Sequence, residues 1–354
     1  MKPKPAVHRM TLPREVVVGN ETLSLISDIC KRLGFSESAF VVTGPETQHV
    51  AGGRVIDLLR DKGIDVDHLV VSSSTMWNVR AVEEKIQESK PQVVLGVGGG
   101  TKIDLAKLGS ARQGIPFISI PTTASHDGIA SPFASVKGLS KPYSVVAQSP
   151  MAIVADTNVI IQSDYCFTAS GCGDVVAKFT AVRDWELAHK VKNEYYGEYA
   201  ASLALMSAKL VMRNADVIKS GVEEGLRAVL EALISCGVAM SIAGSSRPCS
   251  GSEHLFSHAL DLVAPNMAMH GEQCGVGTIM LAYLYGMNWK GIKTTLQKAG
   301  APTTAEELGV EPESVVEALV RACTIRPERY TILEEKRLSY DSAEKLARAT
   351  GVID

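Results

Sequence analysis

Three histidines between positions 254 and 270 offer the imidazole nitrogens that a catalytic metal site uses. His254 and His258 are one helical turn apart, so a helix presents both side chains on one face. His270 follows a break at Pro265 and can return to that face from the next segment. Two or three imidazoles, one carboxylate and one open position form a catalytic zinc site. The pattern therefore predicts a metal centre here.

The carboxylate of such a site must come from elsewhere in the chain. Asp174 ends the run Ser-Gly-Cys-Gly-Asp and is expected at a helix start near a domain junction, which makes it the best-placed candidate. On spacing alone, Glu253, Asp261 and Glu272 remain alternatives. Imidazole and carboxylate also accept nickel or iron, so zinc is the expected metal but not the sole option.

A glycine-rich turn follows an apolar run and is a candidate phosphate cradle. It consists of Gly98, Gly99, Gly100, Thr101 and Lys102. Residues without side chains at the start of a helix let backbone N–H groups approach an anion, which the helix dipole also favours. The turn departs from the dinucleotide fingerprint GxGxxG, because Thr101 stands at the third glycine position. If the turn binds no ligand, Asp104 and Lys107, three residues apart on the following helix, could likewise be a plain surface pair.

A second polar loop, Pro121 to Ser131, combines hydroxyl groups, a carboxylate and glycine directly after another apolar run. Loops at the carboxyl ends of parallel strands are where α/β sheets bind ligands. Ser125, His126 and Asp127 are chain neighbours and cannot converge as a hydrolytic triad. The loop therefore indicates ligand binding and not hydrolysis.

The elements that must position these motifs change along the chain. Short apolar runs alternate with amphipathic stretches and predict a parallel α/β sheet; they cover residues 15–19, 40–44, 68–72, 93–97 and 117–121. Two further runs, residues 145–148 and 151–156, are expected to form a hairpin at the edge of the sheet. From Asp164 onward the pattern is helical, so we expect domains at residues 1–163 and 164–354, with the active site in the cleft between them.

Composition excludes several classes of function. The chain has 36 basic and 39 acidic residues, a net charge of −3, which disfavours nucleic-acid binding. Arg227 and Glu231 interrupt its most apolar run, so no membrane span is expected. Seven cysteines without a CxxC pair are typical of reduced thiols, and together with the lack of an apolar leader they predict a cytoplasmic protein.

Together these motifs resemble the iron-containing alcohol dehydrogenase, glycerol dehydrogenase and dehydroquinate synthase superfamily over nearly the whole chain. The resemblance rests on the glycine turn with Asp104 and Lys107, the PTTASHDGIAS loop, Asp174, and H-x3-H followed by His270-Gly271. Residues 124–132 and 329–333 look most like the archaeal sn-glycerol-1-phosphate dehydrogenase branch. The resemblance implies a Rossmann-like domain followed by an all-helical domain.

The resemblance also implies roles for individual residues. It makes Asp174, His254 and His270 the ligands of one zinc ion per subunit. Asp127 and His258 become catalytic residues that contact the substrate, which Asp174 also touches. The implied NAD(P)-binding residues are Gly98, Gly99, Gly100, Thr101, Lys102, Thr122, Thr123, Ala124, Ser125 and Ser131.

The implied reaction is the NAD(P)H-dependent reduction of dihydroxyacetone phosphate to sn-glycerol 1-phosphate, the glycerol backbone of archaeal membrane lipids. The family also suggests a homo-oligomer. Residues 42–44, at the expected end of the second strand, lack an acid that would repel a 2′-phosphate, which predicts that NADPH is accepted alongside NADH. Lys137 and Lys141 are candidate ligands of the substrate phosphate, and His258 or a water relay could supply the proton.

Three alternatives share most of these features. A dehydrogenase of unphosphorylated polyols differs only in the loop and tail resemblance. A dehydroquinate-synthase-like cyclase is disfavoured, because that family usually has glutamate where this chain has Asp174. A non-catalytic nucleotide-binding protein with a structural zinc is disfavoured by the open metal-site pattern.

Overall fold

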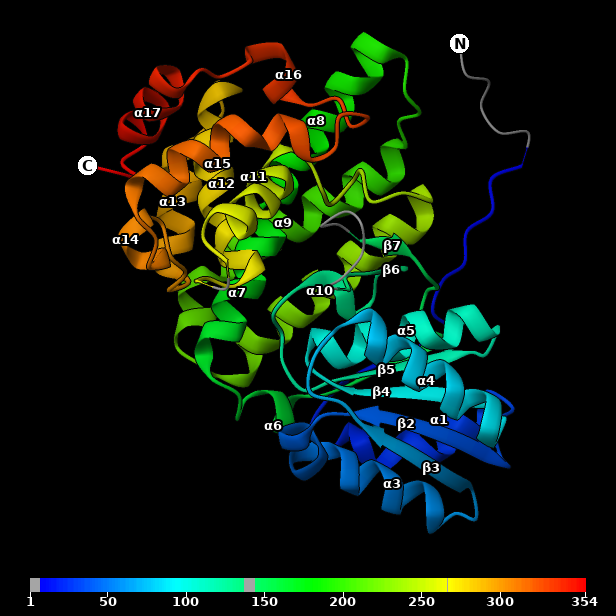
Figure 1. Ribbon diagram of the computed structural model, residues 1–354. Helices are drawn as coiled ribbons and strands as arrows, with labels where there is room; N and C mark the ends of the chain where they lie inside the picture. The colour runs from blue at the N-terminus through cyan, green and yellow to red at the C-terminus, as the bar shows by residue number, and fades with distance from the viewer. Residues whose placement is uncertain (1–6, 137–143, 266) are drawn as a thin grey trace. The chain divides into compact units, whose positions relative to one another are not determined.

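The computed structural model describes residues 7–136, 144–265 and 267–354. They form two compact units, drawn in Figure 1. The sheet unit is Thr11–Phe167, and the helical unit is Thr168–Asp354 with residues 7–10. His8 joins the latter, with Nε2 2.6 Å from the carbonyl oxygen of Ile242. The domain limits at residues 163 and 164 stay a prediction, because compactness alone does not show which segments fold independently. Lys137 and Lys141 lie outside the described residues.

Six parallel strands form the sheet in the order β1-β8-β5-β4-β2-β3, which confirms the α/β fold class. Their bounds are β1 (Glu15–Gly19), β2 (Ser38–Thr43), β3 (Asp65–Val70), β4 (Val93–Gly98), β5 (Phe117–Pro121) and β8 (Ala152–Asp156). β4, β5 and β8 are buried along their whole length, and β2 is buried after its first residue. Continuous apolar runs are typical of parallel strands covered on both faces.

The expected hairpin at the sheet edge was wrong. β8 pairs in parallel with both β1 and β5, so it lies inside the sheet. The antiparallel pair is instead β6 (Phe133–Ala134) with β7 (Val145–Val146), and it belongs to a separate two-stranded sheet. A short apolar run has the same pattern at an edge and in the centre, because periodicity does not specify which strands will be neighbours.

Helices cover both faces of the sheet (Figure 1). They are α1 (Ile26–Arg32), α2 (Pro45–Thr47), α3 (Gly53–Arg60), α4 (Met76–Ser89), α5 (Gly100–Gln113) and α6 (Thr157–Ile160). α1 and α3 pack on one face in a core with Val41 and Leu95. Successive strand residues point to opposite faces, so Phe40 and Val94 point to the face that α4 and α5 cover.

The helical unit contains the remaining helices, except for the first three residues of α7, which belong to the sheet unit. They are α7 (Tyr165–Val176), α8 (Lys178–Lys192), α9 (Glu198–Lys219), α10 (Glu223–Ala243), α11 (Ser252–Val263), α12 (His270–Leu284), α13 (Trp289–Lys298), α14 (Ala305–Leu308), α15 (Pro312–Ile325), α16 (Ile332–Lys336) and α17 (Tyr340–Ala349). α9 packs on α10, and α11 packs on both α12 and α15. Because α11 has helices on two sides, its His254 face is buried.

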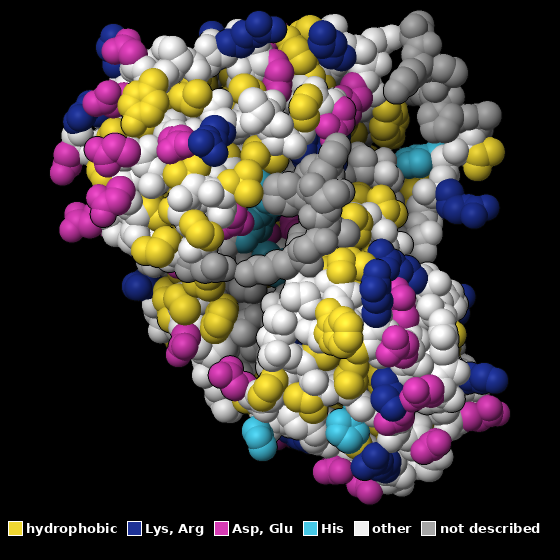
Figure 2. All heavy atoms as spheres, viewed as in Figure 1, with side chains coloured by type: hydrophobic (Ala, Val, Ile, Leu, Met, Phe, Trp, Pro, Cys, Tyr) yellow, Lys and Arg dark blue, Asp and Glu magenta, His cyan; other side chains and the backbone are white. Residues whose placement is uncertain are grey.

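Surface chemistry agrees with the composition. Figure 2 shows basic and acidic side chains intermingled on the face drawn. Among the described residues, α10 alone is long and apolar enough to cross a membrane, and 72% of its most apolar window is buried inside the protein. That burial is typical of a core helix. All seven cysteines are described, and none forms a disulfide.

Candidate active site

The expected cofactor residues gather at the carboxyl edge of the sheet. From β2 the chain moves outward to β3, and from β4 it moves the other way to β5, so the strand order reverses between β2 and β4. Ligands of open α/β sheets bind outside such a reversal. The glycine turn follows β4 and forms the first turn of α5, with Gly99 as the residue before the helix. It is therefore placed where the helix dipole favours an anion.

The polar loop lies beside this turn. β4 and β5 pair up to Gly98 and Pro121, and the backbone N–H of Thr122 donates to the carbonyl oxygen of Gly98 at 3.1 Å. Thr123 Oγ1 lies 3.4 Å from Ser125 Oγ. Thr122, Ala124 and Ser131 are buried. The structure thus brings both groups of expected cofactor residues together at one end of the sheet.

Lys102 and Glu46 add a feature that the sequence reasoning missed. The Lys102 side chain lies across Gly44, directly after β2, where a Cβ would come within 2.2 Å of its Cε atom. Burial lowers the pKa of Lys102, and the negative charge of Glu46 opposes this shift. The end of β2 normally meets the adenosine ribose. An ammonium and a carboxylate are therefore both available there, although residues 42–44 contain neither.

Asp104 and Lys107 are buried, which excludes the alternative of a plain surface pair. Lys107 Nζ donates to Asp104 Oδ1 at 3.0 Å, to the Gly128 carbonyl oxygen at 2.7 Å and to the Phe133 carbonyl oxygen at 2.6 Å. Asp104 Oδ2 accepts the backbone N–H of Ser135 at 2.9 Å. Spacing could not reveal this burial, because the covering loop comes from later in the chain. The ion pair ties that loop to α5.

Asp127 starts the tied segment. It opens a short 3-10 turn, Asp127–Ile129, and its carbonyl oxygen accepts the backbone N–H groups of Ala130 and Ser131 at 3.1 Å each. The Ser131 hydroxyl donates to the Phe133 carbonyl oxygen at 3.2 Å. Because Lys107 holds Gly128 and Phe133, it fixes the backbone on both sides of Ser131.

In the helical unit, three helices bring the expected metal ligands together. Asp174 lies on α7, His254 on α11 and His270 at the first position of α12. The imidazole rings of His254 and His270 are 4.9 Å apart between centroids. Asp174 Oδ1 is 3.7 Å from His254 Nε2. Two imidazoles and a carboxylate are therefore within reach of one ion.

Neighbouring side chains orient both imidazoles. Glu253 Oε1 lies 2.8 Å from Nδ1 of His254, which places the proton on Nδ1 and leaves the Nε2 lone pair available. Ser257 Oγ donates to Gln273 Oε1 at 2.6 Å, so it can accept from Nδ1 of His270 at 2.9 Å. His270 therefore also keeps Nε2 for a metal. Orientation of this kind is typical of metal-ligating histidines.

Asp174 is held as an anion. It lies near the end of α7 and not at a helix start, which corrects the sequence expectation. Lys178, completely buried one turn later, donates to Asp174 Oδ1 at 2.6 Å. Burial opposes ionisation, but the charges of Lys178, His254 and His270 outweigh it and hold the pKa of Asp174 below its usual range. A charged carboxylate is the form that binds a metal.

Other candidate ligands are less suited to a metal. Glu253, Asp261 and Glu272 accept hydrogen bonds from His254, Gln273 and the Met269 backbone, respectively. The sequence reasoning missed Cys274, whose sulfur lies 3.7 Å from His270 Nε2. One possible ligand atom of each of Cys274, His254 and His270 lies within 4.8 Å of the other two. Burial and the charges of Asp174 and Glu253 raise the pKa of the Cys274 thiol well above its usual value. Without a metal the thiol therefore stays protonated, and Cys274 would have to lose this proton to act as a ligand.

Two glycines bring Asp174 to His270. A Cβ on Gly173 would come 2.1 Å from the carbonyl oxygen of Gly271, and one on Gly271 would come 2.0 Å from that of Ser170. Side chains at either position would force α7 and α12 apart. Asp174 directly follows Gly173 in α7, and His270 directly precedes Gly271 in α12. The backbone contact between the two glycines therefore sets the separation of these two proposed ligands.

His258 lies beside the cluster. Its ring stacks on that of His270 at 5.7 Å between centroids. Burial, followed by the positive charges of His254, Arg326 and Arg329, lowers the pKa of His258 to about 3. His258 is therefore neutral near pH 7 and can present an N–H donor to a substrate oxygen.

The start of α11 is fixed by a buried carboxylate. Asp184 Oδ2 accepts from both the backbone N–H and the hydroxyl of Ser252 at 2.6 Å, while Oδ1 accepts from Tyr285 and from the backbone of Ile332. Burial and the charge of Glu253 raise the pKa of Asp184 to about 6. Asp184 links α8, α11, α12 and α16, and so supports the helix that carries His254.

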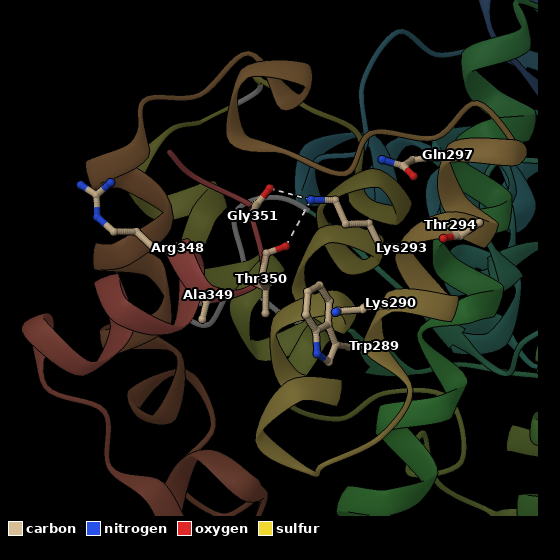
Figure 3. Close-up of a pocket in the computed structure, with 9 residues that line it drawn as sticks. All are labelled: Trp289, Lys290, Lys293, Thr294, Gln297, Arg348, Ala349, Thr350 and Gly351. Carbon is tan, nitrogen blue, oxygen red and sulfur yellow. Dashed lines mark hydrogen bonds between the residues drawn. The ribbon is translucent and has the colours of Figure 1, made fainter.

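A separate open hollow of about 490 Å³ lies between α13 and the end of α17 (Figure 3). Lys293 points to this end and donates to the carbonyl oxygens of Thr350 and Gly351 at 3.1 and 2.6 Å. A cation at a helix C-terminus satisfies its last carbonyl groups. None of the sequence-predicted site residues lines the hollow, and Lys293 has a structural role.

Comparison with known proteins relates the chain to one group of dehydrogenases. Residues 17–163 match the family model described as iron-containing alcohol dehydrogenase. The chain is 55% identical over 98% of its length to the complete glycerol-1-phosphate dehydrogenase [NAD(P)+] of Pyrococcus furiosus. It is also 54% identical to the Methanosarcina mazei protein of the same name, and the match covers 98% of this chain and 97% of that protein. The solved glycerol dehydrogenase of Schizosaccharomyces pombe has a TM-score of 0.81 at 22% identity, with 97% of this chain and 90% of that chain covered.

We predict that Gly173→Ala disrupts the metal centre. The added methyl group meets the Gly271 backbone, so unfolding free energy should fall by about 3 kcal/mol and zinc affinity by at least about tenfold. Thermal unfolding and competition with a chelating dye measure the two effects. Gly53→Ala, at a helical glycine whose nearest contact would be 3.3 Å, is the matched control. Unchanged zinc affinity in a folded Gly173→Ala protein would contradict the role of this contact.

We also predict that Lys107→Met loosens the polar loop. Removing one partner of a buried ion pair should cost about 3 kcal/mol of stability and should raise KM for the cofactor. In the double variant Asp104→Asn/Lys107→Met, stability should recover, since no charge stays unpaired. KM should remain high, since the bonds to Gly128 and Phe133 are still missing. Recovery of both quantities would show that the pair does not position the loop.

Proposed function

The chain belongs to the iron-containing alcohol dehydrogenase family, and from this premise we propose that it reduces dihydroxyacetone phosphate to sn-glycerol 1-phosphate with NADH or NADPH. The observation that carries the proposal is the 55% identity to a glycerol-1-phosphate dehydrogenase over 98% of the chain. The proposed product places the enzyme in the synthesis of archaeal membrane lipids.

The alternatives carry less weight. Eight relatives that are 52–55% identical over 97–98% of the chain are named glycerol-1-phosphate dehydrogenases. The similarity to solved glycerol dehydrogenases, at 22% and 18% identity, concerns the fold alone. We therefore set aside the polyol dehydrogenase, the cyclase and the non-catalytic protein with a structural zinc.

The sheet unit would bind the cofactor. Backbone N–H groups at the start of α5, from Gly98 to Lys102, would hold its phosphates. Thr122, Thr123, Ala124 and Ser125 line the same edge of the sheet, and the loop fixed by Lys107 would present Ser131 to the cofactor. The reaction needs both units, because the expected metal ligands lie in the other one.

The helical unit would hold one metal ion on Asp174, His254 and His270. We propose zinc, because two imidazole nitrogens and a carboxylate suit it, although nickel or iron would also fit this donor set. When bound, the ion supplies a Lewis acid that polarises the ketone. Glu253 and Ser257 orient the two imidazoles, and Lys178 balances the charge of Asp174.

The remaining residues would act on the substrate. The bound cofactor would supply a hydride to the carbonyl carbon, and one proton would be added to the carbonyl oxygen, so that one NAD(P)H and one proton are consumed for each alcohol formed. Neutral His258 would donate a hydrogen bond to a substrate oxygen, and Asp127 would accept one from a substrate hydroxyl. The proton reaches the oxygen through His258 or through a water relay.

Cellular context forms part of the proposal. We propose that the protein works in the cytoplasm as a homo-oligomer. None of its seven cysteines forms a disulfide, which suits a reducing compartment, and the substrate is a small soluble phosphate ester. Size-exclusion chromatography with light scattering measures the oligomeric state.

A direct assay tests the reaction. We expect NADPH absorbance to fall when dihydroxyacetone phosphate is added, to stop falling after chelation, and to fall again when zinc is restored. Chiral analysis should identify sn-glycerol 1-phosphate. Turnover of unphosphorylated polyols alone would move the chain to the glycerol dehydrogenases.

Asp174→Asn tests the metal site. It removes a charged ligand, so we expect zinc content to fall and kcat/KM to drop by at least about 100-fold. Zinc measured by mass spectrometry and steady-state kinetics report the two effects. Asp261→Asn, near the cluster but bonded to Gln273, is the control. Unchanged zinc content and turnover in Asp174→Asn would overturn this assignment.

Lys102 and Glu46 should set the balance between the two cofactors. Lys102→Met removes a cation that could pair with a 2′-phosphate, so kcat/KM for NADPH should fall by about tenfold relative to NADH. Glu46→Gln should shift the ratio the other way. Lys85→Met, on an exposed lysine of α4, is the control. Equal losses with both cofactors would assign Lys102 to the shared part of the cofactor.

A further inference from the structure

Arg329 is a buried cation without a carboxylate partner. It lies between α15 and α16, and only 6% of its surface is exposed. Its guanidinium group donates to the Ser250 carbonyl oxygen and, at 2.7 Å, to the Ser246 hydroxyl. Both acceptors are neutral, and no ion pair of Arg329 occurs among the described residues. Burying a charge without a counter-ion is costly, so this site is suited to an anion.

Two further arginines surround it. Arg247 is neutralised, because it forms a two-pronged ion pair with Glu194 and donates to the Tyr330 carbonyl oxygen. Arg326 lies 3.3 Å from Glu328, whose side chain is mostly exposed and therefore screened. Burial and the charges of Arg326 and Arg247 lower the pKa of Arg329 to about 9, although the charges of Glu194 and Glu253 oppose this shift. Glu194 pairs with Arg247 and Glu253 bonds to His254, so neither carboxylate forms an ion pair with Arg329 among the described residues.

This cluster belongs to the same neighbourhood as the candidate active site. α15, which ends just before Arg326, packs along α11. Arg329 bonds to Ser250, two residues before α11 begins, and α11 carries His258. Arg329 is therefore held beside the start of the helix that carries the residue expected to contact the substrate.

We propose that Arg329, assisted by Arg326, binds the phosphate group of the substrate. This inference rests on the proposed function, in which the substrate is a ketone phosphate. Arginine suits the role because its planar group donates two parallel hydrogen bonds to phosphate oxygens. Ser246 and the Ser250 carbonyl oxygen hold the guanidinium in place before the substrate arrives. The phosphate would be the counter-ion that the buried charge lacks.

The experiment compares two substrates that differ only in the phosphate. For the zinc-loaded enzyme, we expect a strong preference in kcat/KM for dihydroxyacetone phosphate over dihydroxyacetone. Arg329→Gln should reduce this preference by about 100-fold, the effect of removing one partner of a buried charged contact. Arg329→Lys should keep part of it, because the charge stays and the two-pronged contact is lost. Arg321→Gln, at an exposed arginine of α15 paired with Glu317, should not change it.

Two outcomes separate the inference from the proposed function. If the wild-type enzyme shows no preference for the phosphorylated ketone, the proposed function fails. If the wild type has the preference and both Arg329→Gln and Arg326→Gln keep it, the phosphate assignment is overturned while the function stands.

A binding measurement covers the case in which Arg329→Gln does not fold. In calorimetry, inorganic phosphate should bind the wild-type protein and the Arg321→Gln variant with equal affinity. It should bind Arg326→Gln, in which the altered side chain is partly exposed, at least about tenfold more weakly. Equal binding by all three proteins would also overturn the assignment. Thermal unfolding of each variant checks that the comparison concerns folded protein.

Discussion

The contact between Gly173 and Gly271 is the constraint on which the candidate metal centre depends. The backbones of α7 and α12 touch here, and no side chain larger than a hydrogen atom fits at either glycine position. Asp174 and His270 are neighbours of these glycines, so the helix separation fixes the distance between carboxylate and imidazole. Close packing transmits such a constraint, because protein interiors contain little free volume. The arrangement of α11 is then set by α12 on one side and α15 on the other.

Buried charged side chains occur at several places in the molecule, and each of them holds a ligand, a loop or a set of helices in position. Lys178 balances Asp174, Lys107 balances Asp104 while it holds two carbonyl oxygens of the polar loop, and Asp184 joins four helices through neutral donors. Such groups are costly to bury and are tolerated only when hydrogen bonds satisfy them. Arg329 is the exception, since both of its hydrogen-bond partners are neutral. That difference is what marks it as a ligand site.

The two units illustrate different uses of the same local motif, a helix start. At α5, the absence of side chains leaves N–H groups for an anion, and Lys102 reaches back across Gly44 toward the end of β2. At α12, the first residue is itself the functional group, because His270 is held by Ser257 with its Nε2 atom available. Backbone donors serve the first site and an imidazole serves the second, which fits a phosphate-bearing cofactor and a metal respectively.

The sequence by itself determined the parallel sheet, the helical second half and the candidate residues, because apolar periodicity and glycine or histidine spacing are local properties of the chain. It could not determine that β8 lies inside the sheet, that Asp104 and Lys107 are buried, or that Asp174 ends a helix instead of starting one. It also missed Cys274, Glu46 and the arginine cluster. Each of these depends on which distant segments become neighbours: β8 inserts between β1 and β5, and Arg329 meets Ser250 across 79 positions of chain. Only tertiary packing decides such contacts, since their partners leave no shared pattern in the sequence.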